Sequence, residues 1–183
     1  NYTIPLTREA GGSGLARPLK LINRPQRDRI PISIAALGAR AVAQVAEIAE
    51  GWQPIFFDPA RAHLVWGDAL EAGRAKRSAD LGDLEIQVQV FFTLGEPSPR
   101  AIATMRSYLA LYIGGMGAKG KNFYNDIAVQ YGYASEAAEI QDLYLAGRAQ
   151  DAAAAVPDEL LRGVTLFGDA DELRRRVAEF EAA

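Results

Sequence analysis

A short turn, Ile34–Arg40, holds the residues whose types and spacing could do chemistry: Ile-Ala-Ala-Leu-Gly-Ala-Arg. An apolar run ends there and a helical pattern begins. The first N–H groups of such a helix have no partner within it, and the helix dipole favours an anion beside them. Small side chains let a phosphate approach the backbone, so the pattern predicts an anion-binding turn. The alternative is a plain strand-to-helix turn that needs Gly38 for its geometry, because the full glycine-rich fingerprint is absent.

Groups for acid–base, nucleophilic or metal chemistry are not clustered in the sequence. It contains one histidine, His63, and no cysteine, which excludes thiol chemistry and most histidine metal sites. We find no Ser-His-Asp set and no evident pair of carboxylates for acid–base work. The sequence therefore predicts no metal site, and we name no catalytic residue from it.

The elements around the turn form a compact βαβ unit. Residues 32–36 are an apolar run typical of a buried strand, and residues 39–50 carry a helical stripe that ends at Gly51, placed as a C-cap. Residues 52–57 predict a second strand. Strands joined in this way are parallel, and ligands bind at the carboxyl edge of a parallel sheet. The anion-binding turn is therefore expected at a ligand-binding edge.

A third strand is predicted at Leu84–Leu94, where side chains alternate between two faces. The polar face could line a barrel interior beneath a cofactor, or it could belong to an edge strand that faces solvent. Its members are Glu85, Gln87, Gln89 and Thr93.

Helices make up most of the remaining sequence. Asp58-Pro59 predicts a helix that runs to about Gly73, and Ser98-Pro99 predicts another. Asp169 and Glu172 have the spacing of a capping box before the last helix. Further helical segments are expected around residues 123–131, 135–146, 151–155 and 158–162, and a short extended segment at 164–167.

Composition narrows the classes of protein that fit. The chain has 183 residues and a net charge of −3, which argues against general nucleic-acid binding. No apolar run approaches the ~20 residues of a membrane span, and no signal peptide opens the chain. We expect a cytoplasmic protein. Three strands are too few for a closed barrel, so the fold class is helix-rich α/β: half of a barrel or a small open sheet.

Four blocks, in order along the chain, resemble the luciferase-like monooxygenase superfamily. The likeness is greatest to the branch that uses the deazaflavin coenzyme F420 and includes methylenetetrahydromethanopterin reductases. The blocks are Pro31–Ala39 with Ala46–Trp52, Tyr112–Gly117 with Asn122–Asn125, Gln141–Arg148 with Ala155–Leu160, and Leu166–Asp171.

The resemblance implies a (β/α)8 TIM barrel of which residues 1–183 are the C-terminal part of a single domain. Residues 32–36, 52–57 and 84–94 would be strands five to seven, followed by a helical insertion, with residues 1–29 a long loop or insertion. The first four strands would precede Asn1 and the eighth would follow Ala183. This expectation agrees with the first residue being Asn rather than Met and with a last helix that has no stop signal.

The resemblance also implies the cofactor site and the reaction. The site residues carried over are Ala35, Ala36, Leu37, Gly38, Gln53, Pro54 and Ile55. The expected protein is an F420-dependent oxidoreductase that transfers a hydride between the reduced deazaflavin and a small organic substrate, and that forms a homodimer. Its acid–base residues would lie on the early strands, so this segment alone would be inactive.

Two alternatives remain open. One is an FMN-dependent monooxygenase of the same superfamily, which would bind a flavin in place of the deazaflavin. The other, from a different class, is a non-catalytic, barrel-derived binding or interaction protein that has lost its cofactor site.

Overall fold

The computed structural model describes residues 6–14, 22, 24, 26–27 and 29–183. It divides into two units, Asn1–Ile30 and Pro31–Ala183. In the first unit, the amide of Gly12 donates to the carbonyl of Thr7 at 2.8 Å and closes a turn. The loop predicted over residues 1–29 falls largely outside the described residues. The candidate site lies in the second unit, to which the following paragraphs refer.

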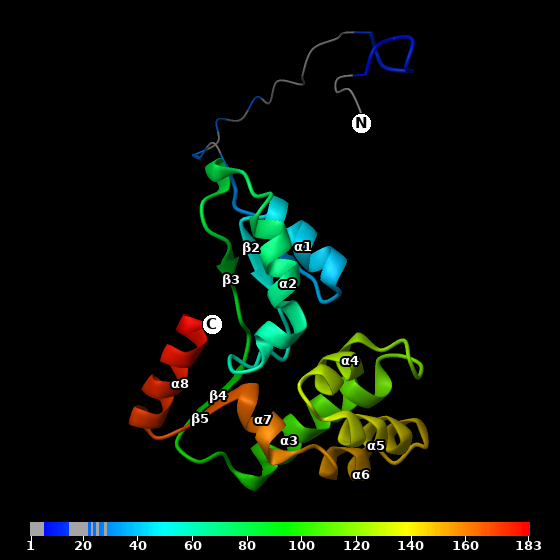
Figure 1. Ribbon diagram of the computed structural model, residues 1–183, viewed down its shortest axis with the longest axis vertical. Coiled ribbons are helices and arrows are strands. Elements are labelled where there is room, and N and C mark those ends of the chain that lie inside the picture. Colours follow the sequence, from blue (N-terminus) through cyan, green and yellow to red (C-terminus); the bar gives the residue numbers. More distant parts are fainter. Residues whose placement is uncertain (1–5, 15–21, 23, 25, 28) are drawn as a thin grey trace. The chain divides into compact units, whose positions relative to one another are not determined.

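Three short strands form the first sheet, in the order β1 (Ser33–Ala35), β2 (Gly51–Gln53) and β3 (Glu85–Ile86). Both pairings are parallel, and Ala35 is in register with Gln53. Helix α1 (Ala39–Ile48) connects β1 to β2 (Figure 1). The predicted βαβ unit is therefore confirmed, and the carboxyl ends of its strands share one edge of the sheet.

The second sheet pairs β4 (Phe91–Leu94) with β5 (Thr165–Gly168), again in parallel. The single strand predicted over Leu84–Leu94 is thus wrong: residues 85–86 pair with β2, and residues 91–94 pair with β5. Because β2 has only three residues, its hydrogen bonds to this segment end at Gln87, whose amide donates to the carbonyl of Trp52. The chain leaves the first sheet there and enters the second four residues later.

Three predicted boundaries in and after the βαβ unit are also wrong. The strand predicted over residues 52–57 is observed over residues 51–53. Gly51 is the first residue of β2 and not a C-cap. A Cβ on it would lie 2.4 Å from the Ser33 hydroxyl, so close strand approach explains the glycine. Helix α2 (Ala62–Arg74) begins four residues after Asp58. The Asp58 side chain accepts from the amide of Ala60 and so stabilises the turn before the helix.

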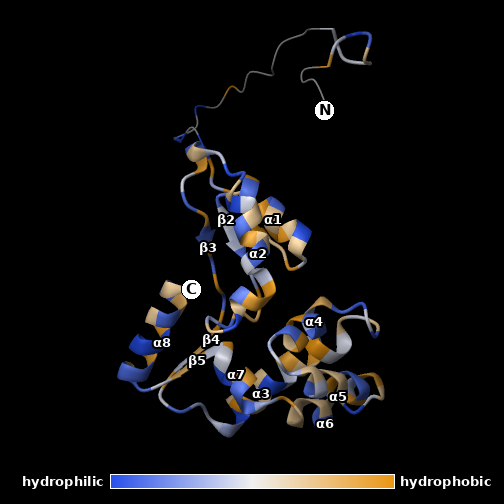
Figure 2. Cartoon of the chain, viewed as in Figure 1, coloured by the Kyte–Doolittle hydropathy of each residue, from blue (hydrophilic) through white to orange (hydrophobic). Residues whose placement is uncertain are grey.

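Helix α2 packs closely on α1. A Cβ on Gly73 would lie 2.3 Å from the carbonyl oxygen of Ala43, so only glycine permits this approach. The buried residues of α1 are Val42, Val45 and Ala46, as the helical stripe predicts. In Figure 2, hydrophobic and hydrophilic residues alternate along these helices, as expected for helices with one buried side.

The helical insertion lies between β4 and β5. It consists of α3 (Pro99–Ala110), the π-helical turn η2 (Leu111–Gly115), α4 (Phe123–Gln130), α5 (Ala134–Leu145), α6 (Ala149–Ala154) and α7 (Asp158–Gly163). Ser98 caps α3, as predicted, by accepting from the amide of Ala101. A 3-10 turn, η1 (Ala79–Leu81), precedes β3.

The last helix, α8 (Ala170–Ala182), follows β5. Its predicted cap, Asp169, accepts from the amides of Asp171 and Glu172. The carboxylate of Glu172 pairs with Arg175, so only the Asp169 half of the capping box is observed.

A large aromatic cluster forms the centre of the core. Trp52 and Trp66 are fully buried and meet edge to face, with 5.3 Å between their ring centroids. Phe57 stacks on Trp66 at 6.1 Å. This core joins the first sheet to α2 and to the helical insertion.

The described residues form a helix-rich α/β fold with two small parallel sheets and no closed barrel. The predicted class is confirmed at that level, whereas an eighth strand after Ala183 stays a prediction. Among the helices in the described part of the chain, none has the length and apolar character needed to cross a membrane.

Candidate functional site

The predicted anion-binding turn is held from the core side by two tryptophans. The indole nitrogen of Trp52 donates to the carbonyl of Ala36 at 2.9 Å, and that of Trp66 donates to the carbonyl of Leu37 at 3.0 Å. In a trans peptide the C=O and N–H groups point in opposite directions. The amides of Leu37 and Gly38, which share peptide groups with those carbonyls, therefore point away from the indoles.

Gly38 is the N-cap of α1 and has no side chain that could accept hydrogen bonds from the first amides of the helix. Its φ of −69° is accessible to any residue, so left-handed geometry does not explain the glycine. A Cβ there would make ordinary contact, at 3.4 Å, with the ring of Phe123. That ring is itself 61% exposed, and Ala39 and Arg40 beside it are exposed. The helix terminus is thus accessible from outside.

The ends of β1 and β2 open onto a cleft of about 940 Å³. This volume is typical of small-molecule sites. Of the seven predicted cofactor residues, the cleft brings together Ala35, Gln53, Pro54 and Ile55. Ala36, Leu37 and Gly38 do not line it and continue from Ala35 along the same sheet edge. The other lining residues are Phe56, Gln87, Val88, Gln89, Val90, Phe91, Met105, Tyr108, Leu109, Val164 and Thr165.

Side-chain amides form the polar part of the cleft. The Nε2 of Gln53 donates to the Oε1 of Gln87 at 2.8 Å, which joins β2 to the segment after β3. Gln89 lines the cleft two residues farther along. Two members of the polar face predicted from alternation, Gln87 and Gln89, therefore face a cavity, while Glu85 is exposed in β3 and does not line it.

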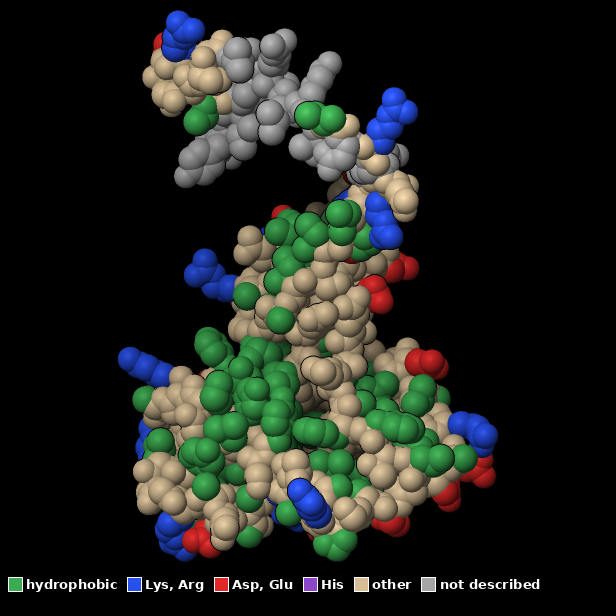
Figure 3. Space-filling view, turned by 180° about the vertical axis from the view of Figure 1, so that it is seen from behind, with side chains coloured by type: hydrophobic (Ala, Val, Ile, Leu, Met, Phe, Trp, Pro, Cys, Tyr) green, Lys and Arg blue, Asp and Glu red, His purple; other side chains and the backbone are tan. Residues whose placement is uncertain are grey.

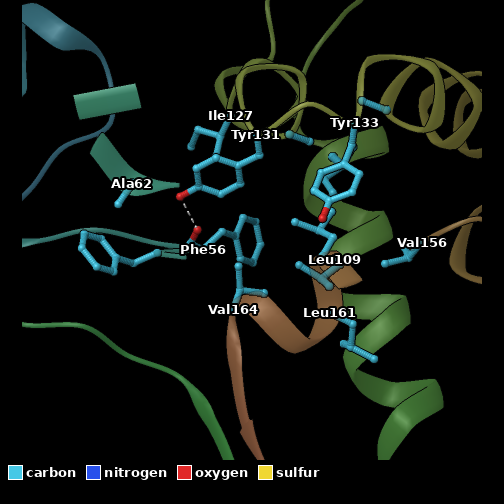
Figure 4. Packing of buried hydrophobic residues seen from close by; sticks show 14 of the residues in the cluster. Phe56, Ala62, Leu109, Ile127, Tyr131, Tyr133, Val156, Leu161 and Val164 are labelled. Carbon is cyan, nitrogen blue, oxygen red and sulfur yellow. Dashed lines mark hydrogen bonds between the residues drawn. The ribbon is translucent and has the colours of Figure 1, made fainter. Parts of the chain in front are cut away.

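Phe56 lies at the end of this edge in an unusual backbone conformation. Its φ is +53°, the one positive value for a non-glycine residue in the described part of the chain. Such a conformation costs about 1–3 kcal/mol and persists only where surrounding contacts enforce it. The hydroxyl of Tyr131 donates to the Phe56 carbonyl at 2.9 Å and accepts from the amide of Asp58 at 3.2 Å (Figure 4). Both contacts are buried.

Aromatic rings form the apolar wall of the cleft. Tyr108 meets Phe91 and Phe56 edge to face, with ring centroids 5.2 Å and 5.9 Å away. Burial, followed by a hydrogen bond with Tyr112, raises the pKa of Tyr108 to about 12. Tyr108 is therefore neutral at physiological pH and can donate a hydrogen bond. Hydrophobic side chains also reach the surface widely on the face that Figure 3 shows, and in β4 Phe92 and Leu94 are 62% and 68% exposed.

Charged groups are absent from the described lining of the cleft, whose polar members are three glutamines, Tyr108 and Thr165. The described residues also contain no group of three or more His, Cys, Asp or Glu side chains able to hold a metal ion. This wall can therefore bind, orient and exclude water. It offers no side chain with a pKa suited to proton transfer near neutral pH.

Sequence reasoning did not identify Phe56 or Tyr108 as site residues. Tyr108 has the helical spacing of a core or interface residue, and it is in fact a half-buried residue that packs on the core while it lines the cleft. No local signal marks Phe56, because it falls within the strand predicted over residues 52–57 and is there expected to be extended. The sequence also contains a basic stretch that could meet a phosphorylated ligand or, as we expect, belong to a solvated loop: Arg17, Lys20, Arg24, Arg27 and Arg29. Arg17 and Lys20 lie outside the described residues.

Comparisons with known proteins identify the family of the chain. The family model for luciferase-like monooxygenases matches residues 11–183. The chain is 38% identical over 185 residues to a protein of Mycobacterium tuberculosis that is provisionally named a coenzyme F420-dependent oxidoreductase. The match covers 100% of this chain and 53% of that protein.

A solved structure gives an independent likeness in fold. The coenzyme F420-dependent tetrahydromethanopterin reductase from Methanopyrus kandleri superposes on 84% of this chain and 42% of its own chain, with a TM-score of 0.62 and 20% identity. The chain thus spans about half the length of the relatives it matches. On the family match and the identity to the mycobacterial protein, it belongs to the luciferase-like monooxygenase family.

Proposed function

We propose that the protein is an F420-dependent oxidoreductase that transfers a hydride between the reduced deazaflavin and a small organic substrate. The observation that carries the proposal is the turn after β1, whose carbonyls are bound from the core by Trp52 and Trp66. This arrangement directs amides outward at a helix N-terminus, where a phosphate group is favoured. The F420-dependent assignment of the mycobacterial relative supports the choice of coenzyme.

The residues present fit a coenzyme with a negatively charged tail and a flat ring. Ala35 to Gly38 would hold the tail, because Ala35, Ala36 and Gly38 are small and the first amides of α1 are free of a side-chain cap. Gln53, Pro54 and Ile55 would lie near the ring or the side chain that joins it to the tail. When bound, the reduced deazaflavin supplies the hydride, whose acceptor is the substrate.

The contribution of this chain is to position the reactants and to exclude water. The apolar wall that includes Phe56, Phe91 and Tyr108 removes water from one side of the cleft. The linked amides of Gln53 and Gln87 offer hydrogen-bonding groups of fixed orientation. Acid–base residues are proposed to lie on other strands of the whole protein, and residues 1–183 alone to be inactive.

Fluorescence of the coenzyme tests the proposal directly. Adding coenzyme F420 to the full-length protein is expected to quench or shift its emission with saturation. No change at high protein concentration would count against the assignment. A yellow preparation with a flavin spectrum would instead favour the FMN-dependent monooxygenase of the same family.

The variant Gly38→Leu separates a cofactor-binding protein from a non-catalytic relative. The added side chain meets the exposed ring of Phe123, which can move, so the fold should survive. In the cofactor-binding protein, F420 binding is lost because the side chain covers the amides. In a non-catalytic relative the full-length protein shows no F420 binding to lose, and only stability shifts.

Location and assembly are further proposals, the first from the composition of the sequence and the second from the resemblance alone. We propose a cytoplasmic homodimer. Light scattering by the full-length protein checks the assembly, and a monomer at micromolar concentration would contradict it.

A further inference from the structure

The hydroxyl of Tyr131 hydrogen-bonds two neighbouring peptide groups in the turn that follows β2, next to Phe56 in the cleft wall. It donates to the carbonyl of Phe56 and accepts from the amide of Asp58, so it spans the turn on both sides of Phe57. Tyr131 is only 3% exposed and caps the end of α4, more than 70 residues away along the chain. Figure 4 shows its ring directed at Phe56 from the helical insertion.

The same buried aromatic group reaches both ligand-facing turns. Tyr131 meets Trp66 edge to face at 6.4 Å. Trp66 in turn donates to the carbonyl of Leu37, in the turn after β1. One turn is therefore fixed by an indole and the next by a phenol, and the two rings are in contact.

Buried tyrosine hydroxyls usually have a hydrogen-bond partner. That general preference does not by itself explain why Tyr131 contacts these two peptide groups. Tyr133, two residues farther on and 8% exposed, has a buried hydroxyl without a hydrogen-bond partner among the described atoms. Burial at this end of the insertion is thus tolerated without a bridge. The Tyr131 hydroxyl instead meets the peptide group that directly follows the strained residue Phe56 and the next peptide group along the chain.

We propose that Tyr131 is a positioning residue for ligand binding. Its hydroxyl holds Phe56 in the left-handed conformation, and this fixes the Phe56 ring as the wall of the cleft against Tyr108. The effect on the backbone stands independently of the coenzyme, whereas the effect on ligand affinity rests on the proposed function.

Amide hydrogen exchange tests the effect on the backbone in the full-length protein. In Tyr131→Phe, the Asp58 amide loses its acceptor and is expected to exchange about tenfold faster. Core amides such as that of Val45 should change much less. Tyr133→Phe, the matched control, removes a hydroxyl that has no partner and should leave Asp58 exchange unaltered. Asp58 exchange that rises only in step with the core amides would overturn the proposal.

Titration with coenzyme F420 tests the effect on affinity. Tyr131→Phe is expected to weaken binding about tenfold, whereas Tyr133→Phe leaves it unchanged. In a Phe56→Gly background, Tyr131→Phe should weaken binding no further, because its effect acts through the Phe56 ring. Fully additive losses would overturn the proposed route.

Two further outcomes are also decisive. If Tyr131→Phe yields little folded protein, its effect on yield is compared in two backgrounds. The loss should be smaller in a Phe56→Gly background, measured against Phe56→Gly alone, than in the wild-type background, because glycine adopts a positive φ without strain. An equal loss in both backgrounds counts against the proposal. If wild-type protein binds no F420, the proposed function fails, and the exchange measurement alone decides the positioning of Phe56.

Discussion

Gly38 is at the N-cap position of α1 but has no side chain that could accept from the helix amides. A substitution there can therefore raise the stability of the protein while it weakens coenzyme binding. Gly38→Ser places a hydroxyl within reach of the first amides of α1. Serine should stabilise the protein by a few tenths of a kcal/mol. It should also weaken F420 binding, because its hydroxyl competes for the amides that the coenzyme tail needs. Urea unfolding and coenzyme titration measure the two effects, and tighter binding would contradict the anion-binding turn.

Asp58 and Glu159 both form an ion pair with Arg61. We expect the more buried of the two carboxylates, rather than the nearer one, to contribute more to the free energy of unfolding. The Asp58 carboxylate is 2% exposed and 2.9 Å from the guanidinium, while that of Glu159 is 71% exposed and 2.6 Å away. Asp58→Ala also removes the acceptor of the Ala60 amide. It should cost about 3 kcal/mol of unfolding free energy.

Glu159→Gln serves as the control for Asp58→Ala, since it removes an exposed ion pair. It should cost less than about 1 kcal/mol. Equal losses in denaturant unfolding would show that exposure does not rank the two partners.

At the residue scale, the sequence does not reveal contacts made by distant side chains. Ala35, Gln53, Pro54 and Ile55, which the family resemblance implies as cofactor residues, line one cleft, and their binding of a cofactor stays a prediction. The positive φ of Phe56 depends on Tyr131, 75 residues away. No local pattern encodes such a partner.

Among the elements, Asn122 connects the π-helical turn to α4. Its Nδ2 donates to the carbonyls of Tyr112 and Ile113, each at 2.9 Å, and its Oδ1 accepts from the amides of Tyr124 and Asn125. The side chain is 2% exposed. Asn122→Ala should therefore cost about 2–3 kcal/mol of unfolding free energy, because it removes a cap and also a donor from two carbonyls, of which that of Ile113 keeps Asn125 as a side-chain donor.

Ser98→Ala is the matched control, because Ser98 caps α3 by an exposed hydrogen bond. Its loss should cost about 1 kcal/mol. Thermal or urea unfolding of both variants checks the ranking, and a smaller loss for Asn122→Ala would contradict the bridging role.

The elements themselves were predicted best where the contacts that define them are local. The buried stripe of α1 and the caps at Ser98 and Asp169 were confirmed. Residues 84–94 alternate as one strand would, yet they divide between two sheets. Alternation reports which side a residue faces, whereas the neighbouring strand is set by the tertiary structure, and β2 is too short to pair with the whole segment.

For the whole molecule, buried tyrosines predict loss of stability in alkaline solution. The pKa of Tyr108 rises from 10.0 to about 12, mainly through burial. Burial also raises the pKa values of Tyr131 and Tyr133. A folded-state pKa above the unfolded value gives stability that is complete below the unfolded pKa and is lost as pH rises through the folded pKa. Stability should therefore decline from pH 10 upward.

Melting temperature measured against pH, together with tyrosinate absorbance, checks this decline. Tyr108→Phe should make the decline shallower without moving its onset, because Tyr131 and Tyr133 still ionise more easily in the unfolded chain. A melting temperature that stays constant between pH 10 and 12 would contradict it.

Both tryptophans of the sequence direct their indole nitrogens at the turn proposed to receive the coenzyme tail. Indole emission depends on the polarity and hydrogen bonding of its surroundings, so their fluorescence is an intrinsic reporter of that turn. Occupancy can therefore be followed optically without a label, and Trp52→Phe and Trp66→Phe would assign each part of the signal to one peptide carbonyl.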